Sequence, residues 1–533
     1  MNFIDAISVL SKSSSYAVST ESDLDAALSS IKSDLYVVMP IEEHLFGLLA
    51  SIREGSKKVI FLCGSSGDGK SELLLRAREK FNQPYIKFHL DATHSFAPHD
   101  SAVDTLNKLF DEYEVGHHSL IIAINIGMLG NYAAAAENKN IGCILKKYLE
   151  KKQVSDGYEF LSFEDYPKFE ITKDGYNAEF VSKIFKKITN SESLLFRVYS
   201  ESKDAGLKSP EKRIFINYNL LCCNEIQKVI IDLLLKVRLF RNQFITTRTF
   251  LDLIYELVTG DGYIFDNLFS LKNNEILEKL REFDPVFLKT KLIDRFLISY
   301  QLKEINEKFE NFKKEIFEKF NLEDLDNSHS YIRLFYFLKF YDLNHSFHKD
   351  FEEDFSEELL KDFLDIYRYH KFLEIDNSLI KKLRDYYNND LLASLRNYIN
   401  KKSPYLSADQ YLIREYGSYQ VIANLKFSAD LSALKQNITS ISGSSFYVFL
   451  KVKDCGEIDF PVDINLFELL MKLKSGYRPN KNDRSVVILL NEIVNRILTL
   501  GNKSKELTFK NTEKESIKEM TFTFEDDYIE VSM

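Results

Sequence analysis

A short glycine-rich segment, residues 64–71, constrains the fold of this chain more than any other part of its sequence. The segment reads GSSGDGKS and matches the pattern G-x-x-x-x-G-K-[ST] at every fixed position. An apolar run, Val59–Cys63, precedes it and favours a buried strand, and the helix-forming residues Glu72–Ala77 follow it. A strand, a tight glycine loop and a helix in this order are typical of a sheet with parallel strands.

The residues around this segment alternate between strand and helix patterns. Short apolar runs predict strands at Lys57–Cys63, Tyr85–Leu90, Leu120–Asn125 and Tyr158–Phe163. Stretches of helical character lie between them, at Ser71–Phe81, Ser101–Tyr113 and Ile141–Lys152. The alternation predicts an α/β P-loop NTPase domain, with a parallel sheet and helices on both of its faces.

Changes in composition predict four parts in the chain. Residues 1–55 form an N-terminal helical segment, and residues 56–265 form the P-loop NTPase domain, which ends in a helical lid. Residues 266–404 have few Gly or Pro and predict a mostly helical domain, whose interspersed charges lie on solvated faces. Residues 405–533 predict a small α+β C-terminal domain, with helices at 466–473 and 486–500, strands at 419–427, 446–452 and 505–510, and a strand pair within 520–533.

The residue types in the glycine-rich segment suit a polyphosphate ligand. Glycines let the backbone turn and bring its N–H groups close to phosphate oxygens, and the positive end of the following helix favours an anion. Lys70 would bring a full charge to the outer phosphates, and Ser71 would offer a hydroxyl to Mg²⁺. Asp68 is an acid, so its carboxylate must point away from the phosphates. We expect ATP and Mg²⁺, with the nucleotide held by Gly64, Ser65, Ser66, Gly67, Asp68, Gly69, Lys70, Ser71 and Glu72.

Two strand ends compete to supply the acidic group that holds magnesium. Asp91 ends one predicted strand with a carboxylate but follows Lys70 closely, whereas Asn125 lies at a more usual distance and ends another strand with a neutral amide. We therefore predict Asp91 as the acidic metal ligand beside Ser71, and Asn125 as a sensor of water or of the γ-phosphate. The alternative role of Asp91 is a capping or loop carboxylate. Glu164 and Asp165, after the fourth strand, are the fallback.

An arginine could stabilise the charge that develops on the transferred phosphate. Arg248 lies in the first turn of a predicted helix after the nucleotide domain, which suits a lid arginine, and a surface salt bridge is the alternative. Arg238 and Arg241 are weaker candidates for a finger that acts between subunits of a homo-oligomer.

Net charge and cysteine content limit where this protein is located in the cell and which partners it binds. The chain has 533 residues and a net charge of −10, which argues against non-specific wrapping of nucleic acid by this chain alone but allows a local basic groove. Five cysteines without metal-ligand spacing indicate a reducing compartment. We expect no signal peptide and no membrane span, hence a cytoplasmic protein. His89, His94 and His99 share no helix or strand face, which favours loop or core histidines over a metal site.

Several segments together resemble one known family. These segments are Phe61–Glu72, Phe88–Phe96, Ala123–Asn131 and Phe163–Phe169. They look like the DptF (DndF) family, the ATPase subunit of the bacterial phosphorothioation-dependent DNA restriction system. The resemblance implies ATP hydrolysis, two companion subunits called G and H, and action of the complex on double-stranded DNA that lacks phosphorothioate. Only the phosphate loop, Gly64–Ser71, carries family residue roles over to this chain.

Two other functions remain open at this stage. A nucleotide-dependent switch or scaffold with little turnover is suggested by the missing carboxylate on the strand Leu120–Asn125. A small-molecule kinase would need an acceptor site, and the long helical region offers no visible one.

Overall fold

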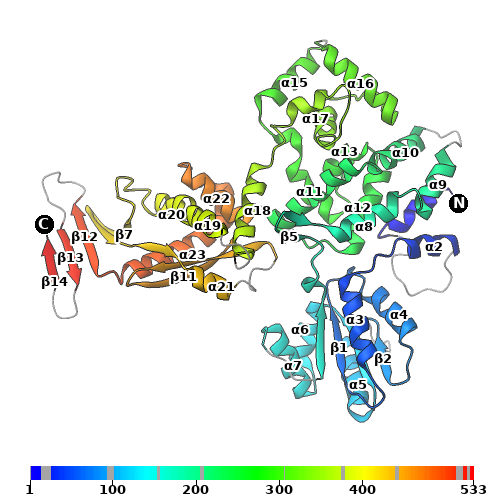
Figure 1. Cartoon of the computed structure of the whole chain (residues 1–533), viewed down its shortest axis with the longest axis horizontal. Coiled ribbons are helices and arrows are strands. Elements are labelled where there is room, and N and C mark those ends of the chain that lie inside the picture. Colours follow the sequence, from blue (N-terminus) through cyan, green and yellow to red (C-terminus); the bar gives the residue numbers. More distant parts are fainter. Residues whose placement is uncertain are drawn as a thin grey trace. The chain divides into compact units, whose positions relative to one another are not determined.

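The computed structural model describes residues 2–13, 26–92, 101–152, 157–203, 209–304, 306–373, 378–437, 443–511, 520–524 and 529–532. The contacts within the chain define two units. Unit one comprises residues 1–170, 178–237 and 243–356, and unit two comprises residues 171–177, 238–242 and 357–533. In Figure 1, unit one runs from blue to green, and most of unit two runs from yellow-green to red. The expected helical domain, residues 266–404, is thus shared between the two units.

A four-stranded parallel sheet begins unit one. Its strands are β1 (Val59–Cys63), β2 (Ile86–His89), β3 (Ser119–Ile124) and β4 (Tyr158–Ser162), in the spatial order β2-β3-β1-β4. The helices associated with it are α3 (Pro40–Ser51), α4 (Lys70–Lys80), α5 (Ala102–Val115), α6 (Ile126–Ala135) and α7 (Lys139–Leu149). Strand β1 lies between β3 and β4, with Val59 opposite Leu120 on one side and opposite Tyr158 on the other. The sequence prediction of a parallel sheet is confirmed.

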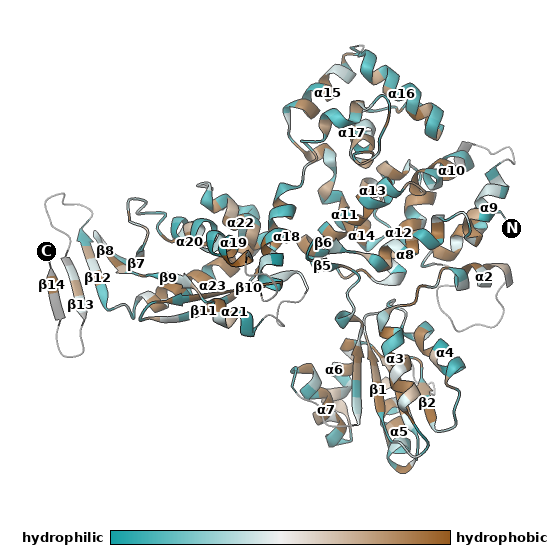
Figure 2. Cartoon of the chain, in the orientation of Figure 1, coloured by the Kyte–Doolittle hydropathy of each residue, from teal (hydrophilic) through white to brown (hydrophobic). Residues whose placement is uncertain are grey.

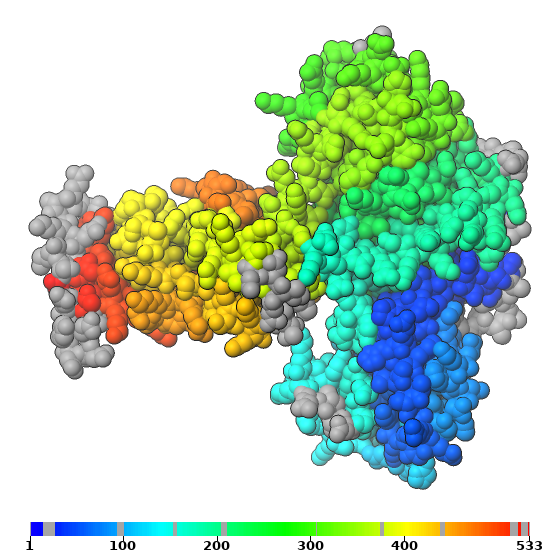
Figure 3. All heavy atoms as spheres, viewed as in Figure 1, coloured from blue at the N-terminus to red at the C-terminus, as the bar shows by residue number. Residues whose placement is uncertain are grey.

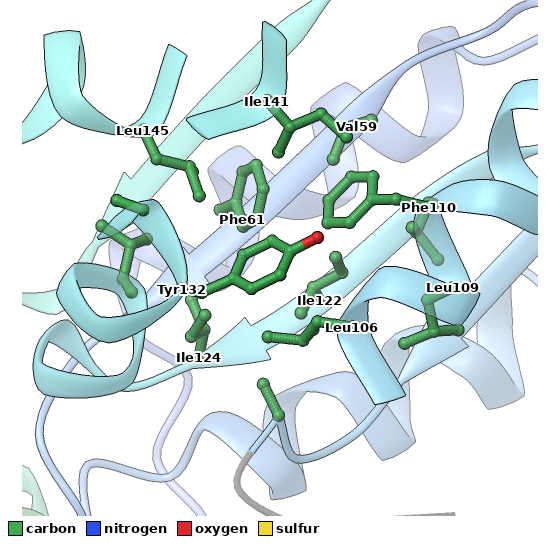
Figure 4. Packing of buried hydrophobic residues seen from close by; sticks show 14 of the residues in the cluster. Val59, Phe61, Leu106, Leu109, Phe110, Ile122, Ile124, Tyr132, Ile141 and Leu145 are labelled. Atoms are coloured by element: carbon green, nitrogen blue, oxygen red, sulfur yellow. The ribbon is translucent and has the colours of Figure 1, made fainter. Parts of the chain in front are cut away.

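Helices cover both faces of this sheet because the strand residues alternate between two apolar cores. Phe61 and Ile122 point to one face, where they pack against α5, α6 and α7 through residues such as Phe110 and Tyr132 (Figure 4). The Phe110 and Tyr132 rings are stacked at a centroid distance of 5.8 Å. The other face carries Ile60, which belongs to the core formed with α3 and α4. All residues of β1 and β3 are buried, which fits their continuous apolar sequences, and β1 is coloured as hydrophobic in Figure 2.

The rest of unit one is helical. Its helices are α1 (Phe3–Ile7), α2 (Ala26–Asp34), α8 (Glu179–Thr189), α9 (Leu194–Lys203), α10 (Ser209–Leu221), α11 (Asn224–Arg241, whose last residues belong to unit two), α12 (Thr247–Thr259), α13 (Ile264–Ser270), α14 (Glu275–Leu280), α15 (Lys291–Gln301), α16 (Glu307–Phe320) and α17 (Ser328–Phe337). An aromatic cluster fills the last part, where Phe335 lies 5.0 Å from Phe351 and 5.1 Å from Phe296 between ring centroids. Phe309, Phe312 and Phe347 also lie against Phe335 in this cluster.

Unit two combines helices with antiparallel sheets. Its helices are α18 (Glu358–Lys371), α19 (Leu379–Asp385), a π-helical turn (Tyr386–Leu391), α20 (Leu392–Ile399), α21 (Leu431–Gln436), α22 (Ile464–Lys474) and α23 (Arg484–Gly501). One sheet has the order β11-β10-β9, and another has the order β14-β13-β12-β8-β7. The strands are β7 (Gln410–Tyr416), β8 (Tyr419–Asn424), β9 (Phe427–Ala429), β10 (Ser445–Val452), β11 (Gly456–Asp463), β12 (Glu506–Asn511), β13 (Met520–Phe524) and β14 (Ile529–Ser532). A two-stranded ribbon pairs β5 (Glu170–Thr172) with β6 (Gly175–Asn177).

Most expected elements appear within a few residues of their predicted bounds. The helix predicted at Ser101–Tyr113 is α5, and the strand predicted at Phe446–Val452 is β10. The predicted terminal strand pair corresponds to β13 and β14, which pair antiparallel. No helix in the described part of the chain is long and apolar enough to cross a membrane.

Candidate functional site

The glycine-rich loop lies at the carboxyl edge of the parallel sheet, between β1 and α4. The backbone N–H of Gly64 donates a hydrogen bond to the Ile124 carbonyl at 3.3 Å, which ties the start of the loop to the end of β3. Gly67 and Gly69 have φ angles of +85° and +99°, in the left-handed region that only glycine adopts readily. The loop therefore needs glycine at both positions to turn into α4.

The first turn of α4 presents positive groups without a side-chain cap. Gly69 is its N-cap residue and makes no side-chain hydrogen bond, so the early backbone N–H groups keep the positive end of the helix open. The Lys70 ammonium folds back and donates to the carbonyl oxygens of Gly64 at 3.0 Å and Ser65 at 2.8 Å. Burial lowers the pKa of Lys70, and the negative charges of Asp68 and Asp91 oppose this shift.

One of the predicted metal ligands, Ser71, contacts the residue before the other, Asp91. The Ser71 hydroxyl donates to the Leu90 carbonyl at 3.3 Å, and Asp91 is the next residue in the segment after β2. The following residue, Ala92, donates its N–H to the Ala123 carbonyl on β3 at 3.0 Å, so this strand end is fixed against the sheet. A serine hydroxyl and a carboxylate are hard oxygen ligands, and this pair fits a magnesium ion.

Asn125 lies at the same edge of the sheet, and its side chain caps the helix α6. It is the N-cap residue of α6, and its Oδ1 atom accepts the Met128 N–H at 2.6 Å. The side-chain oxygen is thus committed to the helix, and the amide NH₂ group is the part that could donate to a ligand. Glu164 and Asp165 are exposed in a 3₁₀ turn (Phe163–Asp165) after β4.

The N-terminus of α12 lies against the loop. The Arg248 N–H donates to the Gly67 carbonyl at 3.1 Å, and the Thr247 hydroxyl donates to the Asp68 carbonyl at 3.4 Å. A Cβ atom added to Gly67 would meet Arg248 Cβ at 3.0 Å, so the approach is close. The structure therefore brings Arg248 to the loop. Arg238 and Arg241 belong to unit two, where Arg238 donates to Asn242 at 3.3 Å.

The remaining predicted residues are less central. The Glu72 carboxylate, on α4, lies 3.7 Å from Arg76 and 3.8 Å from Lys32, so it forms ion pairs with other side chains. His89 is buried at the end of β2. His94 and His99 lie outside the described residues, as does the end of the segment Phe88–Phe96.

Lys168 is the residue that sequence reasoning missed. Its ammonium lies 3.0 Å from Asp68 Oδ1, and the side chains of Lys168 and Asp68 are 6% and 0% exposed. The other carboxylate oxygen of Asp68 accepts the Ser65 N–H at 2.8 Å, so one acid links the loop to Lys168. The ammonium also lies 5.5 Å from the Phe180 ring centroid and 5.4 Å from that of Phe244.

Of the two residues in this ion pair, only Asp68 could be singled out from the sequence. Asp68 is an acid inside a loop built for anions, which signals that a cation must balance it. Burial lowers the pKa of Lys168, and the charge of Asp68 and its hydrogen bond oppose this shift. The carboxylate of Asp68 is thereby engaged with Lys168 and Ser65.

In comparisons with known proteins, no family model, no curated protein and no solved structure matches this chain.

Proposed function

We propose that this chain is a P-loop ATPase that binds ATP and Mg²⁺ at Gly64–Ser71 and hydrolyses the nucleotide. The observation that carries the proposal is the Lys70 ammonium, which is bound to two loop carbonyls at the uncapped start of α4. These carbonyl bonds can be exchanged for bonds to phosphate oxygens, because both are hydrogen-bond acceptors and the phosphates carry more charge. The neighbouring backbone N–H groups and the helix dipole favour the same anion.

The other residues act around the triphosphate. Ser71 and Asp91 would hold Mg²⁺, which neutralises charge on the outer phosphates when it is bound. The Asn125 amide would donate to the attacking water or to the γ-phosphate. Arg248, held against Gly67 by its own backbone, would direct its guanidinium toward the outer phosphate.

The first experiment compares Lys70→Ala with Arg78→Ala, a variant at an exposed position of the same helix. Calorimetry with ATP and Mg²⁺ should detect binding to the unmodified protein and to Arg78→Ala, and phosphate release should be lost in Lys70→Ala. An Asp91→Asn variant should bind ATP but lose the effect of Mg²⁺ on affinity. If Lys70→Ala hydrolyses ATP at the normal rate, the proposal is wrong.

The resemblance to the DptF (DndF) family suggests the cellular role. In that role the chain is the ATP-hydrolysing subunit of a bacterial defence complex, with companion subunits G and H, that acts on double-stranded DNA lacking phosphorothioate. Affinity purification from native cells, with Lys70→Ala as the control, tests this role. Recovery of both companions supports it, and a pull-down that contains neither companion contradicts it.

A nucleotide-dependent switch with little turnover is the second candidate. The observation that favours it is Asn125, whose side-chain oxygen caps α6 and which supplies no carboxylate to activate water. Tight ATP binding without steady-state phosphate release, in the presence of DNA and companions, would establish the switch and exclude the ATPase.

A further inference from the structure

A large cavity in unit two has an unusual charge for this acidic chain. Its volume is about 1270 Å³, and it lies between the end of α20, the loop before β7, the loop after α22 and the first half of α23. In Figure 3 these segments are coloured yellow near residue 400 and orange near residue 480. Six cationic side chains line it, from Arg396, Lys401, Lys402, Arg478, Lys481 and Arg484. No Asp or Glu among the described residues lines it.

Most of these cations face solvent. Lys401, Lys402, Arg478, Lys481 and Arg484 are exposed, and Lys402 also forms an ion pair with Glu415. Arg484 begins the 18-residue helix α23, directly after the N-cap residue Asp483. A concentration of positive charge on a chain with a net charge of −10 favours a polyanionic ligand at this place.

The size of the cavity favours a ligand with several phosphates. The cations come from separate segments of the chain, so they can contact phosphates that are spaced along a backbone, which one small anion would not do. We propose that this cavity, here called the basic groove, binds the phosphodiester backbone of double-stranded DNA.

The aromatic residues of the groove favour a duplex over a single strand. The Tyr398 hydroxyl donates to Asn491 at 2.8 Å, and the Tyr477 hydroxyl donates to Asp483 at 2.8 Å. Both rings are partly buried and tethered at their hydroxyl ends, and the Lys401 ammonium lies 4.8 Å from the Tyr398 ring centroid. Rings held in the wall are poor platforms for bases, whereas binding of single strands usually depends on such stacking. The groove therefore reads backbone charge and is independent of base sequence.

The test uses the full chain and a labelled duplex. The groove variant carries Arg478→Ala, Lys481→Ala and Arg484→Ala, and a matched control carries Lys435→Ala, Lys453→Ala and Lys503→Ala, which remove three exposed cations from the same unit. Circular dichroism confirms that both variants fold.

The groove variant should bind the duplex at least ten-fold more weakly than the unmodified protein. The slope of log affinity against log salt should become shallower by roughly 3, about 0.9 for each phosphate that the groove no longer neutralises. The control should change neither quantity. Equal affinities for the groove variant and the unmodified protein, or equally weakened binding in the groove variant and the control, would overturn the proposal.

Competition identifies the ligand class. Unlabelled duplex should compete best, and a single strand of the same length should compete less well. If tripolyphosphate competes better than the duplex, the groove binds a small anion. If polyglutamate competes as well as the duplex, the groove attracts any polyanion without preference. Either result overturns the proposal. The same measurements on Lys70→Ala should be unchanged, because the groove does not depend on the nucleotide. If the proposed ATPase activity is not found, the proposal that the basic groove binds DNA is thus unaffected.

Discussion

Replacement of Lys168 by methionine should destabilise unit one strongly. Methionine keeps the length of the side chain but leaves the Asp68 carboxylate, which is fully buried, without its cation. Removal of one partner from a buried ion pair typically costs about 3–5 kcal/mol. The exposed pair Lys183–Glu179 on α8, with an N–O distance of 2.6 Å, is the matched control. Lys183→Met should cost about 0.5 kcal/mol, since exposed helix pairs contribute little.

Circular dichroism during urea unfolding is the assay, because the chain contains no Trp for fluorescence. Hydrogen exchange in peptides from β1 to α4 would locate the loss at the loop. A double variant, Asp68→Asn with Lys168→Met, removes both charges and keeps an acceptor for the Ser65 N–H. It should regain most of the lost stability, since a buried pair replaced as a whole costs little. A loss below about 1 kcal/mol in Lys168→Met would refute the reasoning.

Two further predictions concern a backbone contact and a buried histidine. Gly67→Ala should lower the free energy of unfolding by about 1–2 kcal/mol in the same urea assay, because the position has a left-handed backbone and the new Cβ meets Arg248 at 3.0 Å. Gly47→Ala is the control, since a Cβ there meets nothing within 4 Å, and it should stabilise α3 by up to about 1 kcal/mol. Equal effects of the two substitutions would contradict this explanation. Burial lowers the pKa of His370 to about 4, so the folded state binds fewer protons than the unfolded state between pH 6.5 and 4. The free energy of unfolding should therefore fall by about 3 kcal/mol as pH decreases through this window. His370→Phe should lose this pH dependence, whereas a variant of the exposed His329, His329→Gln, should keep it. An unchanged pH profile in His370→Phe would exclude the explanation.

The parallel sheet could be predicted because its signals are local. Continuous apolar runs such as Val59–Cys63 are buried on both faces, and the glycine pattern at residues 64–71 fixes where the strand ends and α4 begins. The contact of Ser71 with the segment after β2 also follows from local information, since carboxyl ends of parallel strands meet at one edge.

Other features depend on contacts between distant residues. Lys168 lies 100 residues from Asp68 in sequence, and nothing in its own neighbourhood marks it as the partner of the loop. The cations of the basic groove are spread from Arg396 to Arg484 through a chain of negative net charge, so composition hides them. The cap that Asn125 supplies to α6 is local, but its side chain also suited a sensor, and spacing alone could not separate these roles.

The backbone hydrogen bond between Arg248 and Gly67 links the glycine-rich loop directly to the first turn of α12. A shift of the Gly67 carbonyl would therefore act on that turn through the Arg248 N–H. That helix is anchored farther along by Asp252, a buried acid that accepts the Lys12 N–H at 2.8 Å and the Asn274 amide at 2.8 Å. If the loop binds a nucleotide as proposed, a shift there would tilt α12 about this anchor, and the helices packed against it, α10, α13 and α14, would be displaced with it.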